Sequence, residues 1–117
     1  MRKLFLLSLL IFCSLSVCGQ EVCADNGGIC VIQFNASFNI ANSVTWYTKL
    51  TDCDVSNVDI MERPDLQTKY EIVVVPTIII LENGEEVKRY QANIMMQMEA
   101  TKREVQETID EILMSSF

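Results

Sequence analysis

Residues 73–86 read VVVPTIIILENGEE, and this stretch predicts a buried strand that turns sharply back on itself. Residues 77–81 are all β-branched or aliphatic, which is typical of a strand covered on both faces of a sheet. Asn83 and Gly84 follow, and this dipeptide is the strongest short-range hairpin signal because both turn positions need positive φ angles. We therefore expect residues 86–91 to return as the partner strand.

Pro76 stands immediately before the buried strand. A proline cannot donate to a strand ladder, so it is tolerated at the first residue of a strand, in a constrained turn. A cis peptide bond is one conformation that fits such a turn.

Apolar periodicity elsewhere predicts alternating strands and helices. The order β, α, β, α, then a hairpin and a last helix places the first two strands parallel through a right-handed crossover, with antiparallel strands added at one edge. We expect an α/β fold with a mixed sheet of about four to five strands and helices on both faces. The remaining strands are expected at 29–34 and 54–60, and the helices at 39–50, 64–70 and 95–114.

The stretch from Tyr70 through Pro76 to Gly84 resembles the second half of a thioredoxin. Residues 57–60 resemble the preceding strand of that family and its connection, and the resemblance extends over about residues 28–113. It implies the thioredoxin fold, with a cis proline at Pro76 that faces the active-site motif.

Residues 34–38 resemble the loop that leads into the Cys-x-x-Cys motif of the family, and Asn39 and Asn42 then fall on the two cysteine positions. Disulfide exchange needs a thiolate as attacker and a second thiol to resolve the mixed disulfide, and an amide supplies neither. We expect no catalytic residue here. Asn39 is interpreted as a helix N-cap, the alternative being an amide that holds a ligand.

Gln33 lies where the resemblance places a buried acid that assists proton transfer. A neutral amide cannot act as that base, so we expect Gln33 to be a hydrogen-bonded polar residue inside the sheet.

The N-terminus has the pattern of a secretory signal peptide. Two basic residues precede an apolar run over residues 4–17, which is short for a bilayer span, so we assign residues 1–19 to a leader. A membrane anchor or an amphipathic arm is the alternative. Residues 15–18 also weakly resemble a bacterial lipoprotein box, so lipidation at Cys18 is a less favoured option. Residues 20–28 then form a polar arm and residues 29–117 the domain, in a secreted or periplasmic protein.

The charge balance excludes some partners. Without the leader, seven basic residues face sixteen acidic ones, a net charge of −9. Such a chain does not favour nucleic acid or anionic membranes, so membrane contact is expected only through the leader or a lipid on Cys18. The chain has no histidine, and we expect neither a metal nor a cofactor.

Three cysteines lie outside the leader, at Cys23, Cys30 and Cys53. A secreted protein usually pairs its cysteines, and all three pairings are open. We favour a structural bridge between Cys53 and one of the other two. A catalytic or regulatory pair is the alternative, and Cys30 and Cys53 are also compatible with a role as small buried apolar residues.

Two further features bear on function. Met95, Met96 and Met98 form either a core-packing cluster, which we favour, or an adaptable surface. Trp46 is expected to be exposed if Val44 and Tyr47 face the core, and an exposed tryptophan near the site would favour a binding role.

The resemblance implies a groove formed by Phe38, Asn39, Val75 and Pro76, in which the backbone beside the proline pairs with an extended protein or peptide segment. Since that pairing needs no cysteine, the first hypothesis is a thioredoxin-like binding protein without dithiol activity. The alternatives are a thiol-disulfide oxidoreductase that uses Cys23, Cys30 and Cys53, and a structural subunit.

Overall fold

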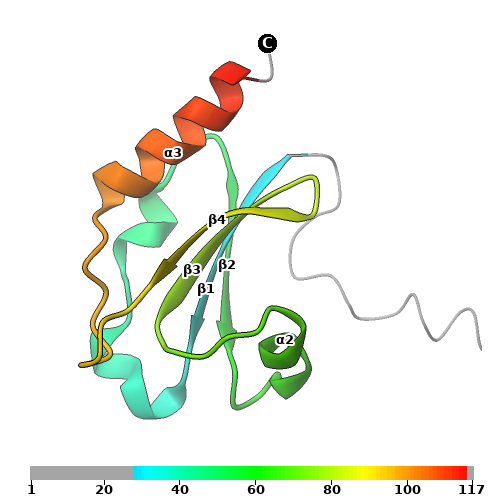
Figure 1. Cartoon of the computed structure of the whole chain (residues 1–117). Coiled ribbons are helices and arrows are strands. Elements are labelled where there is room, and N and C mark those ends of the chain that lie inside the picture. The colour runs from blue at the N-terminus through cyan, green and yellow to red at the C-terminus, as the bar shows by residue number, and fades with distance from the viewer. Residues whose placement is uncertain (1–27, 116–117) are drawn as a thin grey trace, which may run out of the picture.

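The computed structural model describes residues 28–115, which form a four-stranded mixed sheet with helices on both faces (Figure 1). The strands lie in the order β2-β1-β3-β4, with β1 parallel to β2 and antiparallel to β3, and β3 antiparallel to β4. The predicted α/β fold with a mixed sheet is confirmed. The strands are β1 (Ile29–Asn35), β2 (Asp54–Asp59), β3 (Thr77–Glu82) and β4 (Glu85–Gln91).

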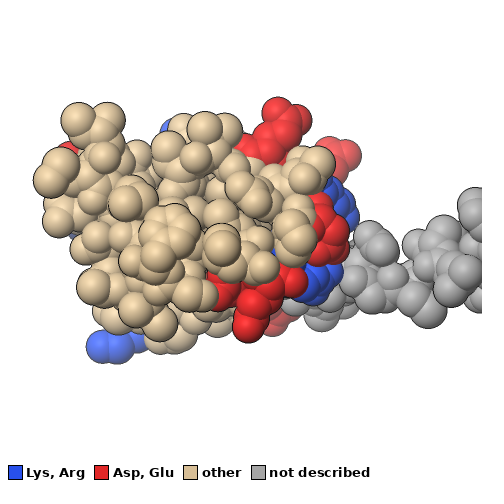
Figure 2. All heavy atoms as spheres, turned by 90° about the horizontal axis from the view of Figure 1, so that it is seen from below, with Lys and Arg blue, Asp and Glu red and all other residues tan. Residues whose placement is uncertain are grey.

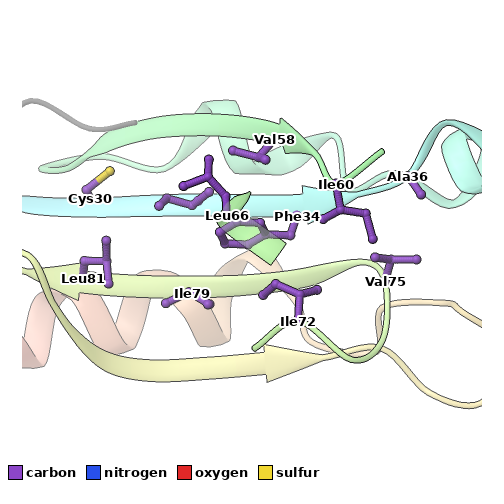
Figure 3. Packing of buried hydrophobic residues seen from close by; sticks show 11 residues of the cluster. Cys30, Phe34, Ala36, Val58, Ile60, Leu66, Ile72, Val75, Ile79 and Leu81 are labelled. Atoms are coloured by element: carbon purple, nitrogen blue, oxygen red, sulfur yellow. The ribbon is translucent and has the colours of Figure 1, made fainter. Parts of the chain in front are cut away.

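Each face of the sheet is covered by one α-helix. Helix α2 (Pro64–Lys69) places Leu66 over one face, near Phe34 (Figure 3). The Phe34 ring also contacts the Tyr70 ring in a tilted arrangement, with ring centroids 5.4 Å apart. Helix α3 (Lys102–Ser115) covers the other face with one apolar stripe. We call these two layers the α2-side core, centred on Ile32, Phe34, Val58, Leu66 and Ile79, and the α3-side core, centred on Val31, Ile78, Ile80, Val105 and Ile109. None of the helices in residues 28–115 has the length and apolarity that crossing a membrane requires.

The hairpin predicted from Asn83 and Gly84 joins β3 to β4. Their φ angles are 54° and 85°, so both residues adopt the left-handed backbone that the turn needs. An added Cβ at Gly84 would meet nothing within 4 Å, so glycine is favoured there by its backbone freedom alone.

The helix predicted over residues 39–50 is wrong. Two short 3₁₀ helices, η1 (Ser37–Asn42) and η2 (Trp46–Lys49), replace it. The side chain of Gln33 causes the break, because its Oε1 accepts from the backbone N–H of Val44 at 2.7 Å and its Nε2 donates to the Val44 carbonyl at 3.1 Å. Both backbone groups of Val44 are thereby used outside a helical ladder.

The last helix begins at Lys102, not at residue 95. Thr101 and Glu104 form a reciprocal capping box, in which the Glu104 N–H donates to Thr101 Oγ1 at 3.2 Å and the Thr101 N–H donates to Glu104 Oε1 at 3.1 Å. Before it, the Asn93 side chain accepts from the backbone of Met95 at 2.9 Å and of Gln97 at 3.1 Å, which folds residues 93–97 into a compact turn.

Candidate functional site

The end of the sheet where β1 finishes brings together the residues that the sequence singled out. Asn39 Nδ2 lies 3.4 Å from the carbonyl oxygen of Val75, although the two residues are 36 positions apart. The Val75–Pro76 peptide bond is cis, and Pro76 leads directly into β3. The predicted proximity of Asn39 to the proline loop is therefore present in the structure.

Asn39 does not cap a helix, so that prediction is wrong. The residue flanking η1 is Ala36, and Asn39 lies inside η1 with a non-helical backbone at φ −117° and ψ 23°. Its side chain instead joins three segments, because Nδ2 donates to Asn35 Oδ1 at 3.2 Å and to the Met96 carbonyl at 3.2 Å as well as to Val75. Its Oδ1 accepts from Asn42 Nδ2 at 2.9 Å.

The two positions that match the cysteines of the family motif are thus occupied by amides bonded to each other. Asn35 extends the group, since its Nδ2 donates to the Asn39 carbonyl at 3.2 Å and to Ser43 Oγ at 2.8 Å. Gln33 is 1 % exposed and fully bonded to Val44 and Asn57, as the sequence predicted for a polar residue inside the sheet. We call this group the amide cluster: Gln33, Asn35, Asn39, Asn42 and Asn57.

The amide cluster cannot perform acid–base or thiol chemistry. Carboxamides neither ionise near neutral pH nor supply a nucleophile, whereas they satisfy many backbone donors and acceptors at once. In the described part of the chain, no buried side-chain nitrogen or oxygen lacks a hydrogen-bond partner. The cluster therefore holds the loops at this end of the sheet in place without introducing charge.

Of the groove residues named from the sequence, one is exposed and three are buried. Asn39 is 4 % exposed, Val75 5 % and Pro76 less than 2 %, whereas Phe38 is 67 % exposed. A partner can therefore contact the Phe38 side chain directly, whereas pairing with the backbone beside Pro76 stays a prediction.

Around these buried residues lies an exposed surface that the sequence reasoning missed. Because Asn39 bonds to both Val75 and Met96, three loops meet here, and each exposes apolar side chains. Figure 2 shows this end of the molecule as a broad uncharged area with acidic residues along one border. We call it the apolar face: Phe38, Ile40, Val73, Ile94, Met95 and Met96.

The methionines contribute differently from the prediction. Met98 packs partly against the α3-side core, but Met95 is 67 % exposed and Met96 39 %, so core packing is wrong for these two. Trp46 is half-buried and also packs against the α3-side core.

The two cysteines in residues 28–115, Cys30 and Cys53, lie away from the site. Cys30 is disulfide-bonded and Cys53 is a free thiol, so the favoured bridge through Cys53 is wrong, while Cys23 lies outside the described residues. Cys30 pairs with Asp54, and Cys53 lies one residue before Asp54. Neighbouring residues of a strand point to opposite faces of the sheet. Cys30 accordingly packs in the α2-side core and Cys53 against the α3-side core.

The environment of Cys53 lowers its reactivity. Burial, together with the neighbouring carboxylates of Asp54 and Asp52, raises the pKa of the Cys53 thiol to about 11. Little thiolate is present at neutral pH. Within residues 28–115, no three Cys, Asp or Glu side chains are arranged to hold a metal ion.

Comparison with protein families and solved structures finds thioredoxins. The family model described as Thioredoxin matches residues 21–110. A designed protein aligns with 25 % identity over 76 % of this chain and 84 % of its own, with a TM-score of 0.59. A mutant thioredoxin from Halobacterium salinarum NRC-1 aligns with 20 % identity over 74 % of this chain and 76 % of its own, at a TM-score of 0.58.

A thioredoxin from Fasciola hepatica aligns with 24 % identity over 74 % of this chain and 83 % of its own, at a TM-score of 0.55. A search of curated protein sequences finds no significant match. The structural likenesses below 25 % identity bear on the fold alone.

Proposed function

Because the chain belongs to the thioredoxin family, we propose that it is a secreted or periplasmic member that binds a segment of a partner protein and exchanges no disulfide at the family's usual position. The observation that carries this proposal is the hydrogen bond between Asn42 Nδ2 and Asn39 Oδ1, at 2.9 Å, where the resemblance places the reactive pair. Two amides bonded to each other there leave no attacking and no resolving thiol.

The two cysteines of the described residues, Cys30 and Cys53, support the same view. Cys30 is five strand residues before Asn35, so the two lie about 16 Å apart along β1 at about 3.3 Å per residue. Cys53 immediately precedes Asp54, the β2 residue that pairs with Cys30, so it lies at the same distant end of the sheet. The pKa of its thiol is also raised. Both sulfur atoms are therefore too far away to exchange a disulfide with a substrate held at the apolar face.

Binding is the activity that the exposed surface supports best. Isolated apolar side chains are common on protein surfaces, but several exposed ones on loops that meet at one end of the molecule are typical of an interaction site. Phe38 and Met95 are each 67 % exposed, Val73 is 82 % and Ile94 is 98 %. Methionines add an unbranched, adaptable surface that accommodates segments of varied shape.

The proposed location follows from the leader and from the disulfide. Residues 1–19 have the pattern of a signal peptide, although they lie outside the described residues. The disulfide at Cys30 agrees with an oxidising compartment, where such bonds persist.

Two measurements on the purified protein test the proposal. Insulin reduction with dithiothreitol should proceed at the uncatalysed rate. Selection from a randomised peptide-display library should enrich binders, and Met95→Lys should weaken them by at least about tenfold because it places a charge in an apolar contact.

The matched control is Met114→Lys, since Met114 is 74 % exposed but lies at the other end of α3. It should leave peptide binding unchanged. Catalysed insulin reduction that Cys53→Ser abolishes would instead support the thiol oxidoreductase alternative. Failure to enrich any peptide would overturn the binding role.

A further inference from the structure

A polar hollow of about 370 Å³ lies beside the apolar face, between residues 42–46 on one side and Gln97 and Met98 on the other. It exists because the chain between η1 and η2 is extended: Ser43 has φ −61° and ψ 139°, and Gln33 holds Val44 out of any helix. Trp46 and Met98 both pack against the α3-side core, so two walls of the hollow are fixed.

The lining of the hollow has a distinct chemistry. None of its residues is charged. Asn42 uses Nδ2 to reach Asn39, which leaves its Oδ1 able to accept. Among the described residues, the Trp46 indole N–H and the Gln97 side-chain amide have no hydrogen-bond partner either. The hollow therefore offers donors, acceptors and a flat aromatic surface, but no counter-ion.

We propose that this hollow receives the carboxamide side chain, asparagine or glutamine, of the segment that docks on the apolar face. A carboxamide is planar, carries two donors and one acceptor, and can lie against the indole while bonding to Asn42 and Gln97. Gln97 is exposed and Asn42 and Trp46 are half-buried, so water solvates these groups until a docked segment covers them. Under such a segment, a charged side chain would lose solvation without gaining a partner, and an aliphatic one would leave these polar groups unpaired. The inference rests on the proposed binding function and specifies what that site selects.

The peptide-display library gives the test. Peptides enriched on the purified protein should combine apolar residues with Asn or Gln at one fixed spacing. In a synthetic peptide from that set, replacing the carboxamide by Glu or Leu should weaken binding by at least about tenfold. Binding should also shift the emission of Trp46, which is the single tryptophan of the chain.

A specificity exchange separates this inference from general stickiness. Gln97→Glu places a carboxylate in the hollow, so the selected residue should change from Asn or Gln to Lys or Arg. Val87→Glu is the matched control, because it adds the same charge on β4 at the hairpin end of the sheet, and it should leave the preference unchanged.

The outcomes are distinguishable. Peptides that carry only apolar residues, and whose selection Gln97→Glu does not alter, would overturn the carboxamide site and leave the binding function in place. A library that yields no binders at all would overturn both.

Discussion

The side-chain amide of Asn39 donates to the backbone oxygen of Met96 across 3.2 Å and joins two loops that are 57 residues apart. The same nitrogen faces Val75 and Asn35. One buried carboxamide thus positions the three loops that present the apolar face, where a thioredoxin motif would carry a reactive sulfur. Its role is structural, and its removal should be detected first as a loss of stability.

Asn39→Asp should destabilise the protein by at least about 2 kcal/mol at pH 7, because a buried carboxylate would face three oxygen acceptors that it cannot donate to. Burial and these oxygens should raise the pKa of the new carboxyl above its unfolded value of about 3.9. The variant is then closest to the wild type at low pH and loses stability as the pH rises through that raised pKa. Urea unfolding of both proteins at pH 4 and pH 7 measures the difference.

Asn83→Asp is the matched control, because it makes the same chemical change at an exposed turn residue. Its free energy of unfolding should remain within about 0.5 kcal/mol of the wild type at both pH values. Equal losses for the two variants would mean that the amide cluster does not hold the loops.

Met96 adopts a left-handed backbone with φ 58°, which is unfavourable for a side-chain residue. Met96→Gly should therefore leave the free energy of unfolding unchanged or raise it by up to about 1 kcal/mol, since relief of strain offsets the added freedom of the unfolded chain. Peptide binding should weaken at the same time because an apolar contact is lost. Met95→Gly, at a residue without positive φ, should weaken binding and also cost about 1 kcal/mol. A large loss of stability in Met96→Gly would argue that its side chain supports the fold.

Short-range signals predicted most of the sheet correctly. The β-branched run before Asn83 and Gly84 specified β3, the turn and β4, because each of those preferences is local to a few residues. The parallel pairing of β1 with β2 followed from the handedness of crossovers. The proximity of Asn39 to Val75 followed from the family resemblance.

The errors arise where distant side chains decide the backbone. Gln33 breaks the expected helix from 11 residues away, and a helical pattern in residues 39–50 contains no sign of it. The start of α3 was readable, since Thr101 and Glu104 have capping-box spacing, but the apolar stripe was extended past it. The burial of Pro76 depends on tertiary packing between distant segments, which no local pattern encodes.

Restoring two cysteines should not restore the activity of a conventional thioredoxin. Position 39 is 4 % exposed and lies in a kinked 3₁₀ segment, so Asn39→Cys with Asn42→Cys would place the first thiol in a buried site that faces the Val75 and Met96 carbonyls. Such a thiol should have a raised pKa, because burial and the neighbouring carbonyl oxygens disfavour the thiolate and no α-helix N-terminus offsets them. Insulin reduction by the double variant should be at least about tenfold slower than with a conventional thioredoxin.

Titration of thiolate absorbance in the same double variant measures that pKa directly. Insulin reduction at the rate of a conventional thioredoxin would show that this end of the sheet is still built for thiol chemistry.

Cys53 should react slowly with thiol reagents in the folded protein. Its pKa rises from 9.0 to about 11, so the thiolate fraction at pH 8 should be about 100-fold smaller than in the unfolded chain. The neutral thiol contributes fully to the free energy of unfolding below pH 9. This contribution is lost as the pH rises through 11, because the thiol of the unfolded chain ionises first. Burial is the largest cause and the carboxylates of Asp54 and Asp52 add to it, so Asp52→Asn with Asp54→Asn should accelerate modification without abolishing the protection. The test compares the rate at which an aromatic disulfide reagent modifies the folded and the urea-unfolded chain, with the Cys30 disulfide intact. Equal rates in the two states would show that the half-buried Cys53 thiol is not protected by the fold.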